Sequence, residues 1–163
     1  MNHFAASAAA DLDAVDWQLL DLLQSDGRLT FSELGRRVSL SAPAVTERVR
    51  RLEQRGVITG YSAQVDASKL GLPIEALVRV RVRSLDGPRF RATILPLPTV
   101  TSADHTTGDD CWLLRVRCRS TGELEALVEQ AQRYGETTTS LVFSSPVVGR
   151  PITRPETGLP AGR

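Results

Sequence analysis

Three features of the sequence predict an α+β protein with two small domains. Apolar residues recur at helical spacing through the first third of the chain, strictly alternating segments follow from residue 76, and a stretch containing Gly and Pro separates them. A repeat of 3.6 residues indicates amphipathic helices, and a repeat of two indicates strands with one buried face. With 163 residues, of which 41% are hydrophobic, the chain is long enough to bury two small cores.

The first third of the chain predicts three short helices. Asp13 is a suitable N-cap for the first helix, and Thr30 with Glu33 forms a capping-box pattern for the second. Ser41 is the expected N-cap of the third helix, which should end at Gly56. About four residues join the second and third helices, which is the spacing of a helix-turn-helix. The side chains expected to face the core are Leu12, Val15, Leu19, Leu20, Leu23, Phe31, Leu34, Val38, Val45, Val49 and Leu52.

The rest of the chain predicts a domain built around a sheet. Residues 57–66, VITGYSAQVD, indicate a strand or small hairpin that would make the helix-turn-helix a winged one. A strand, a short helix, two strands joined near Gly108, a capped helix from Ser120 and a last strand follow, in the β-α-β-β-α-β order of the ferredoxin-like fold. We expect a disordered leader at 1–10, the helix-turn-helix domain at 11–60, a strand and linker at 61–73, the ferredoxin-like domain at 74–148 and a flexible tail at 149–163.

The composition argues against several classes of protein. The net charge is +1, so any basic surface must be local. Cys111 and Cys118 lie an odd number of residues apart in an alternating segment, which places them on opposite faces of a strand where they cannot pair. With His3 and His105 as the only histidines, we expect no metal site, no cofactor and no catalytic residues. No apolar run could span a membrane and the N-terminus does not resemble a signal peptide, which fits a cytoplasmic protein.

The third predicted helix carries arginines on the sides that its apolar residues leave free. Seven arginines and three glutamates lie between residues 28 and 55, so this region is basic although the chain is not. Guanidinium groups pair with phosphates and read guanine edges, which predicts that the outer face enters the major groove of double-stranded DNA. The alternative is a solvated helix with internal pairs such as Glu47–Arg51. The residues predicted to contact DNA are Ser41, Pro43, Thr46, Glu47, Arg50 and Arg51, with phosphate contacts from Arg28, Arg36 and Arg37.

Two predicted strands each carry three arginines on one face. A nucleic-acid surface and a solvated sheet face both fit this pattern. The arginines are Arg79, Arg81 and Arg83 on one strand, and Arg115, Arg117 and Arg119 on the other.

The segment TTGDD at 106–110 has the groups that an amino-acid ligand needs. A zwitterion requires hydroxyl or N–H donors for its carboxylate and an acidic or carbonyl acceptor for its ammonium. The alternative is that this segment is only a polar turn. The residues predicted to bind an effector are Thr106, Thr107, Gly108, Asp109 and Asp110, with further hydroxyls from Thr137, Thr139 and Ser140.

Residues 11–148 resemble the Lrp/AsnC family of leucine-responsive, or feast/famine, regulators. The most specific part is the run RVRRLE followed by GVITGY at 48–61, and TTGDDCWLLRV and TTTSLV are similar to family segments further on. The resemblance implies a transcriptional regulator whose second domain senses an amino acid near the hairpin, between dimers. It also implies self-assembly as a dimer, or as a tetramer or octamer built from dimers. In such a dimer the arginine-bearing sheet faces would pack against each other, which would require acidic partners because unpaired buried charge is costly. Cys111 departs from the pattern, because the family often has an acidic residue there.

Two other functions stay open at this point. Siroheme decarboxylase subunits resemble the same family and would be expected to use histidine and arginine around a tetrapyrrole. An accessory protein could instead bind an amino acid and use its helical domain to bind protein, in which case loss of the Arg50–Arg51 face would be tolerated.

Overall fold

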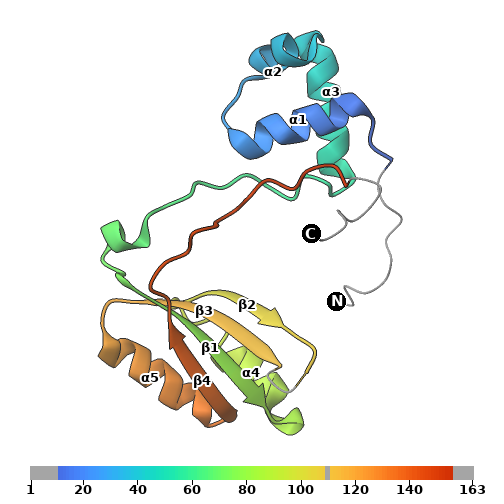
Figure 1. The fold of residues 1–163 in the computed structure, drawn as a ribbon. Helices are drawn as coiled ribbons and strands as arrows, with labels where there is room; N and C mark the ends of the chain where they lie inside the picture. The colour runs from blue at the N-terminus through green and yellow to red at the C-terminus, as the bar shows by residue number, and fades with distance from the viewer. Residues whose placement is uncertain (1–10, 109–110, 156–163) are drawn as a thin grey trace, which may run out of the picture. The chain divides into compact units, whose positions relative to one another are not determined.

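The computed structural model describes residues 11–108 and 111–155, and these form two compact units. The first unit contains the described residues up to Ala63 and those from Val147 onward, and the second is Gln64–Pro146 (Figure 1). The chain therefore passes from one unit to the other twice, once on each side of the second unit. The expected leader at 1–10 and the last part of the expected tail, 156–163, lie outside the described residues.

Three helices make up the first unit: α1 (Ala14–Ser25), α2 (Phe31–Val38) and α3 (Ala42–Gln54). All three predicted N-caps are confirmed. The Asp13 and Thr30 side chains accept from the backbone N–H groups of Asp16 and Glu33 in complete capping boxes, and Ser41 caps α3. These caps satisfy N–H groups that have no partner within a helix, so they fix where each helix begins.

Close contact between α2 and α3 depends on Gly35. A Cβ atom at this position would lie 2.5 Å from the carbonyl oxygen of Leu40, which is nearer than real Cβ atoms come. Ser39 closes α2 in the left-handed region with φ of 58°, and the N–H of Leu40 donates to the Gly35 carbonyl at 2.9 Å. The tight turn places α3 across the other two helices, around a core of Leu19, Leu34, Val38, Val45 and Val49.

Two details of this unit differ from the sequence predictions. Phe31 was predicted to face the core, but it is the first residue of α2 and is 43% exposed. Residues 57–66 form no strand, so the predicted wing is absent from the part of the chain that the structure describes. Gly56, with φ of 68°, turns the chain after α3, and both Val57 and Ile58 donate to the carbonyl of Leu52. These bonds end the helix without providing a second strand to pair with.

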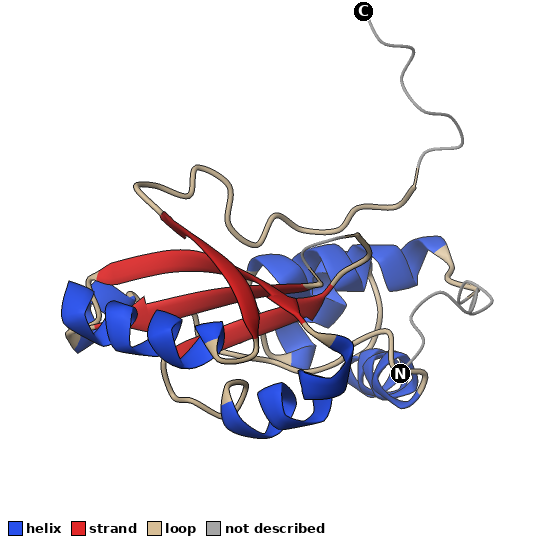
Figure 2. Cartoon of the chain, turned by 90° about the horizontal axis from the view of Figure 1, so that it is seen from below, coloured by secondary structure: helices blue, strands red, loops and turns tan. Residues whose placement is uncertain are grey.

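The second unit has the predicted ferredoxin-like order. Strand β1 (Ile74–Val82), helix α4 (Gly87–Thr93), strands β2 (Val100–His105) and β3 (Trp112–Cys118), helix α5 (Thr121–Gln132) and strand β4 (Gly135–Leu141) follow one another. Short 3-10 turns occupy Ala67–Leu70 and Ser84–Asp86. The strands, drawn in red in Figure 2, form one antiparallel sheet in the order β2-β3-β1-β4, as labelled in Figure 1.

One face of this sheet is buried beneath the two helices. Phe90 of α4 and Leu124, Leu127 and Ala131 of α5 pack against Val78, Val80, Leu114 and Val116 of the central strands. Alternate residues of the same strands point to the other face, which no helix of this unit covers. The arginines of β1 and β3 lie on that open face.

Candidate DNA-binding and effector sites

The core packing of α3 leaves one side of the helix exposed. Val45, Val49 and Leu52 are at most 1% exposed and set the inner side. The sequence-predicted residues Ser41, Pro43, Thr46, Glu47 and Arg50 are all exposed, as expected for an outer face. The Thr46 hydroxyl donates to the Ala42 carbonyl at 2.9 Å, so its methyl group is the part turned outward.

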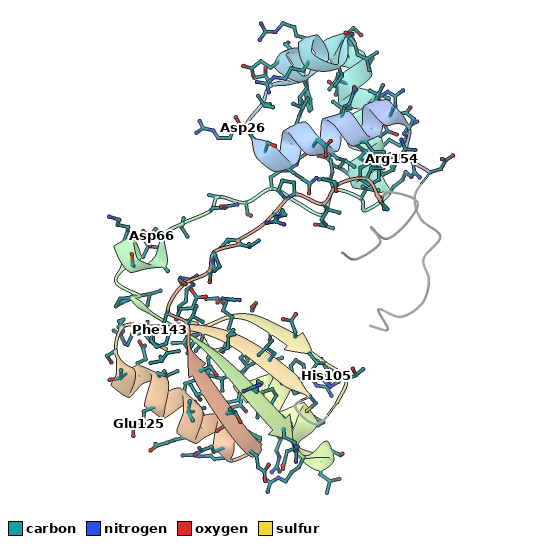
Figure 3. All side chains as sticks on the ribbon, viewed as in Figure 1. Asp26, Asp66, His105, Glu125, Phe143 and Arg154 are labelled. Atoms are coloured by element: carbon teal, nitrogen blue, oxygen red, sulfur yellow. The ribbon has the colours of Figure 1, made fainter. Side chains whose placement is uncertain are left out.

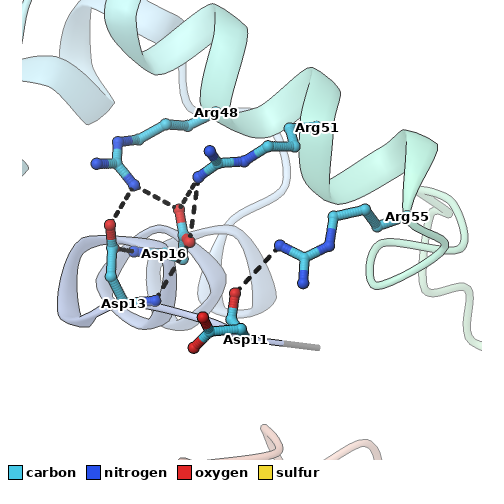
Figure 4. A network of polar contacts seen from close by, with 6 residues as sticks. All are labelled: Asp11, Asp13, Asp16, Arg48, Arg51 and Arg55. Atoms are coloured by element: carbon cyan, nitrogen blue, oxygen red, sulfur yellow. Dashed lines mark hydrogen bonds and ion pairs between the residues drawn. The ribbon is translucent and has the colours of Figure 1, made fainter. Parts of the chain in front are cut away.

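Three of the four arginines of α3 and its C-cap turn instead towards the start of α1 (Figure 4). Arg48 contacts Asp13 at 2.7 Å and Asp16 at 2.8 Å through one guanidinium nitrogen. Arg51 contacts both carboxylate oxygens of Asp16 at 3.4 and 3.5 Å. Arg55 donates to the carbonyl oxygen of Asp11 at 3.1 Å.

Asp16 is the centre of this network and is its most buried member. Its side chain is 2% exposed, whereas those of Arg48 and Arg51 are 27% and 49% exposed. The Asp16 carboxylate also accepts from the backbone N–H of Asp13, so the same group closes the capping box of α1 and anchors α3. A buried carboxylate is tolerated only when it is paired and hydrogen-bonded, and both conditions are met here.

The network also changes the proton affinity of its exposed members. The N–H of Asp16 and then the Arg48 guanidinium lower the pKa of Asp13 below its ordinary value of 3.8. The hydrogen bonds from Arg48 to Asp13 and Asp16 raise the pKa of that arginine. Both groups are therefore held in their charged forms, and α1 and α3 are joined by charge as well as by apolar packing.

Arg50 is the arginine of α3 that the network does not include. It is exposed, and within residues 11–108 and 111–155 no ion pair or hydrogen bond of its side chain occurs. Arg28, Arg36 and Arg37 are exposed as well, on the α1–α2 loop and on α2. The structure thus places Arg50, Arg36 and Arg37 on the surface of the helix-turn-helix, while Arg51 is held against α1. The alternative pair Glu47–Arg51 does not form among the described residues.

Sequence reasoning missed Asp13 and Asp16 as partners of the arginines. The signal was available, because the two acids are three residues apart at the start of α1 and Arg48 and Arg51 have the same spacing on α3. Residues three apart on a helix share a face, so two such pairs on packed helices can meet. Only the crossing of α1 and α3, which the sequence pattern does not specify, brings them together.

The arginines of the sheet are also largely paired. Glu75 of β1 lies opposite Arg117 of β3 in the sheet and contacts both Arg115 and Arg117, the latter at 2.6 Å. Arg81 lies 3.7 Å from Glu136, Arg83 pairs with Asp86 and Arg119 pairs with Glu123. The open face is therefore a mixed-charge surface and not the continuous basic patch that the sequence allowed.

The predicted effector residues fall into two separate groups. Thr106, Thr107 and Gly108 are exposed on the β2–β3 hairpin, while Asp109 and Asp110 lie outside the described residues. The strand register places Trp112, Val80 and Thr137 in one row, so Thr137 is near the hairpin end of the sheet. Thr139 lies further along β4, and Ser140 points to the opposite face from Thr137 and Thr139 because strand side chains alternate.

Cys111 packs inward at the base of this hairpin. Its sulfur accepts from the Val82 N–H at 3.3 Å and is half-buried beside the end of β1. A side chain in this position links the base of the hairpin to the end of β1. Cys118 lies in the core, and both cysteines are free thiols, as the odd spacing predicted.

An open depression of about 470 Å³ lies where β1 ends and β4 begins. It offers charges of both signs, with Arg81 and Glu136 on its wall, and the Gln132 amide donates to Thr137 Oγ1 at 3.2 Å next to it. Gly135 lies on the wall at a point where the backbones of β4 and β1 are so close that a Cβ would overlap the Arg81 carbonyl. Its lining residues are Arg81, Val82, Arg83, Ser84, Gln132, Gly135 and Glu136.

Two kinds of feature do not occur in the part of the chain that the structure describes. No group of three His, Cys, Asp or Glu side chains could hold a metal ion. No helix has both the length and the apolar composition needed to cross a bilayer.

Known proteins match both units. Residues 12–53 match the AsnC-type helix-turn-helix domain, and residues 75–152 match the Lrp/AsnC ligand binding domain. The HTH-type transcriptional regulator LrpC of Bacillus subtilis is 38% identical over 133 residues, which are 82% of this chain and 92% of LrpC. The leucine-responsive regulatory protein of Rhizobium meliloti is 40% identical over 108 residues, 64% of this chain and 69% of that protein.

Solved structures agree with these matches. The structure of B. subtilis LrpC has a TM-score of 0.78 at 37% identity and covers 82% of this chain and 96% of LrpC. The complex of the transcriptional regulator NMB0573 of Neisseria meningitidis with L-Met has a TM-score of 0.79 at 27% identity, over 86% of this chain and 96% of that one. With both units and their order accounted for, the chain belongs to the Lrp/AsnC family of helix-turn-helix transcriptional regulators.

Proposed function

We propose that this regulator binds double-stranded DNA through the outer face of α3, with Arg50 as its main cationic contact. The observation that carries the proposal is the division of the α3 arginines, since Arg48, Arg51 and Arg55 are engaged with α1 and Arg50 is exposed. Pro43, Thr46 and Glu47 lie on the same exposed side, where side chains of a recognition helix reach base edges. Arg36 and Arg37 of α2 supply phosphate contacts beside them.

The DNA-bound form is a dimer or an assembly of dimers. One helix-turn-helix reads only a few base pairs, whereas a two-fold pair reads two half-sites about one helical turn apart or a multiple of that distance. The open face of the sheet, with Leu77 and Leu113 among charged residues that pair within the chain, suits contact with a second subunit. Sedimentation of the full chain tests this, and a monomer at micromolar concentration would contradict it.

The second domain binds an amino acid or a related small zwitterion. Support comes from the hairpin with Thr106, Thr107 and Gly108 and from the neighbouring depression, whose wall carries the paired charges of Arg81 and Glu136, complementary to a carboxylate and an ammonium. The related regulator NMB0573 was solved with L-Met, which fits the same ligand class. A bound ligand alters DNA binding only to the extent that its affinity differs between the assembly states.

A regulator of this kind acts in the cytoplasm, where the DNA is, and needs no catalytic group. The siroheme decarboxylase-like alternative is not favoured, since the relatives found are transcriptional regulators. His105, the histidine within the described residues, stacks on Trp112 with ring centroids 4.6 Å apart. The accessory-protein alternative predicts that DNA binding is absent, which the following experiment decides.

Genome-wide footprinting with and without a panel of amino acids tests the proposal. Wild-type protein is expected to protect a limited set of sites, and Arg50→Ala is expected to lose most of them while retaining its melting temperature. Arg89→Ala, at an exposed position of α4 in the other unit, is the matched control for the loss of one surface arginine. If the wild-type protein protects no sites, or if Arg50→Ala protects the same sites, the assignment of this face is wrong. If no amino acid changes the footprint, the proposed effector response is wrong, while the proposed DNA binding stands.

A further inference from the structure

Residues Val147–Pro155, here called the C-terminal arm, belong to the helical unit although they follow the ferredoxin-like domain in the chain. A pair of hydrogen bonds attaches the arm to α1. The Gln24 side-chain amide donates to the carbonyl of Ile152 at 3.0 Å, and the N–H of Ile152 donates to the Gln24 amide oxygen at 2.8 Å. One amide side chain thus forms hydrogen bonds with both the N–H and the carbonyl of one residue, as a neighbouring strand would. This contact fixes the arm on the last turn of α1.

The sequence of the arm favours an extended backbone at two arginines. Arg150 and Arg154 are each followed by a proline, at 151 and 155. A residue before proline is restricted to extended conformations, and proline itself has a fixed φ angle. The arm therefore loses less conformational freedom on binding than a flexible tail of the same length would.

Both arginines of the arm are exposed cations. From Ser144 to Pro155 the sequence has two arginines and no acidic residue. Neither Arg150 nor Arg154 has an ion pair with any residue that the structure describes, in contrast to Arg48 and Arg51. Alternate residues of a strand-like segment share a face, which predicts that both arginines lie on the side of Ile152, itself 75% exposed. Figure 3 shows Arg154 at the end of the described arm, beside the helices of this unit.

The attachment point lies next to a part of the unit that can approach DNA. Gln24 precedes the α1–α2 loop, which contains the exposed Arg28. In homeodomains, a three-helix variant of the helix-turn-helix, this loop and the C-terminal end of the third helix contact the DNA backbone. Four extended residues span about 13 Å, a length over which one DNA strand carries about four phosphates. Two arginines four residues apart can therefore pair with separate phosphates of one strand.

We propose that the C-terminal arm is part of the DNA-binding surface and that Arg150 and Arg154 contact backbone phosphates outside the groove that α3 enters. The inference rests on the proposed function, because it requires that the protein binds duplex DNA. It extends that function by adding a contact from the far end of the chain, which two hydrogen bonds to Gln24 attach to the helical unit.

The test is the salt dependence of binding to a fluorescein-labelled duplex of mixed sequence, measured by anisotropy with the full chain. Each lost phosphate contact reduces the steepness of log K against log salt by about 0.9, so Arg150→Ala with Arg154→Ala should reduce it by about 1.8. Between 50 and 200 mM salt, wild-type affinity should fall about 12-fold more than that of the double variant. Gln24→Leu, which cannot make the two hydrogen bonds, should change the slope in the same direction by a smaller amount.

The matched control is Arg89→Ala with Arg91→Ala on α4, which removes the same charge from exposed positions of the other unit. Its slope should equal that of the wild type. If the arm variant and this control have the same slope, the proposal is overturned while the proposed function stands. If the arm variant instead changes the sedimentation of the free protein and leaves the slope unchanged, the arm is an assembly contact and the proposal is also overturned. A wild-type protein that binds no duplex would overturn both.

Discussion

The arginines of α3 and those of the sheet differ in where their acidic partners come from. On α3, Arg48 and Arg51 pair with Asp13 and Asp16 of another helix, so their charges join two elements of the core. On the sheet, Arg115 and Arg117 pair with Glu75 of the adjacent strand, on a face that no helix of that unit covers. The arginines of α3 thus connect two packed helices, whereas those of the sheet balance charge between two adjacent strands.

The comparison predicts that Asp16 contributes more to stability than any other acid of these two networks. Replacing it with Ala leaves Arg48 with one exposed partner and removes half of the capping box of α1. Removing one partner of a buried pair typically costs about 3–5 kcal/mol. We expect Asp16→Ala to lower the free energy of unfolding by about 3 kcal/mol, measured by urea denaturation. Asp21→Ala, at an exposed α1 position, should change it by less than about 0.5 kcal/mol, and equal effects would contradict the assignment.

The same change on the sheet should have a smaller effect. The side chain of Glu75 is 16% exposed, and those of its two arginine partners are 41% and 31% exposed. Water can therefore hydrate the two guanidinium groups when the carboxylate is removed. We expect Glu75→Gln to destabilise the protein by about 1–2 kcal/mol, because the amide keeps one acceptor for the two guanidinium groups. Glu125→Gln on the exposed side of α5 is the control. A loss as large as that of Asp16→Ala would remove the distinction between the two networks.

Acidic pH should destabilise the helical unit because it protonates the carboxylates of Asp13 and Glu33. The Asp16 N–H and Arg48 lower the pKa of Asp13, and the Thr30 hydroxyl and N–H lower that of Glu33. The pKa of each of these carboxyl groups is lower in the folded state than in the unfolded state. Their stabilising contribution is therefore fully present at pH values above the unfolded-state pKa, and it is lost as the pH falls through the folded-state pKa. The melting temperature should therefore fall as the pH decreases below about 4. Asp13→Asn keeps a good N-cap and should make the melting temperature depend less on pH in this acidic range. If the variant and the wild type show the same dependence, Asp13 does not have this role.

The smallest effect is expected at Tyr61, just beyond α3. Partial burial, followed by the hydrogen bond to Glu53 at 3.0 Å, raises the pKa of its phenol to about 12. Glu53→Gln should shift its phenolate absorbance to lower pH by only part of that rise, because burial is the larger cause and is retained. A return of the pKa to 10, the ordinary value, would mean that Glu53 accounts for the whole shift.

Local signals in the sequence were sufficient for the elements and for the inner side of α3. The caps at Asp13, Thr30 and Ser41 and the apolar spacing of Val45, Val49 and Leu52 are set within a few residues, so they could be predicted without a fold. The β-α-β-β-α-β order followed from the same kind of pattern. Phe31 was placed wrongly because periodicity alone does not show that the first turn of a helix can project beyond the core.

The pairing of charges could not be predicted, because it depends on how elements cross. Arg51 falls on the edge of the outer face by helical geometry, but the approach of α1 provides Asp16, 35 residues away, as its partner. Glu75 meets Arg117 only through the register of β1 and β3, and Gln24 meets Ile152 across 128 residues. The set of Thr137, Thr139 and Ser140 was proposed from composition, and strand alternation separates Ser140 from the other two.

We propose that the acids of α1 determine which arginines of α3 bind DNA. The most direct measurement is the salt dependence of duplex binding for Arg50→Ala and Arg51→Ala, each compared with the wild type. If Arg50 contacts DNA and Arg51 is held by Asp16, then Arg50→Ala reduces the steepness of log K against log salt by about 0.9 and Arg51→Ala leaves it nearly unchanged. A reduction for Arg51→Ala that equals or exceeds the one for Arg50→Ala would contradict the account.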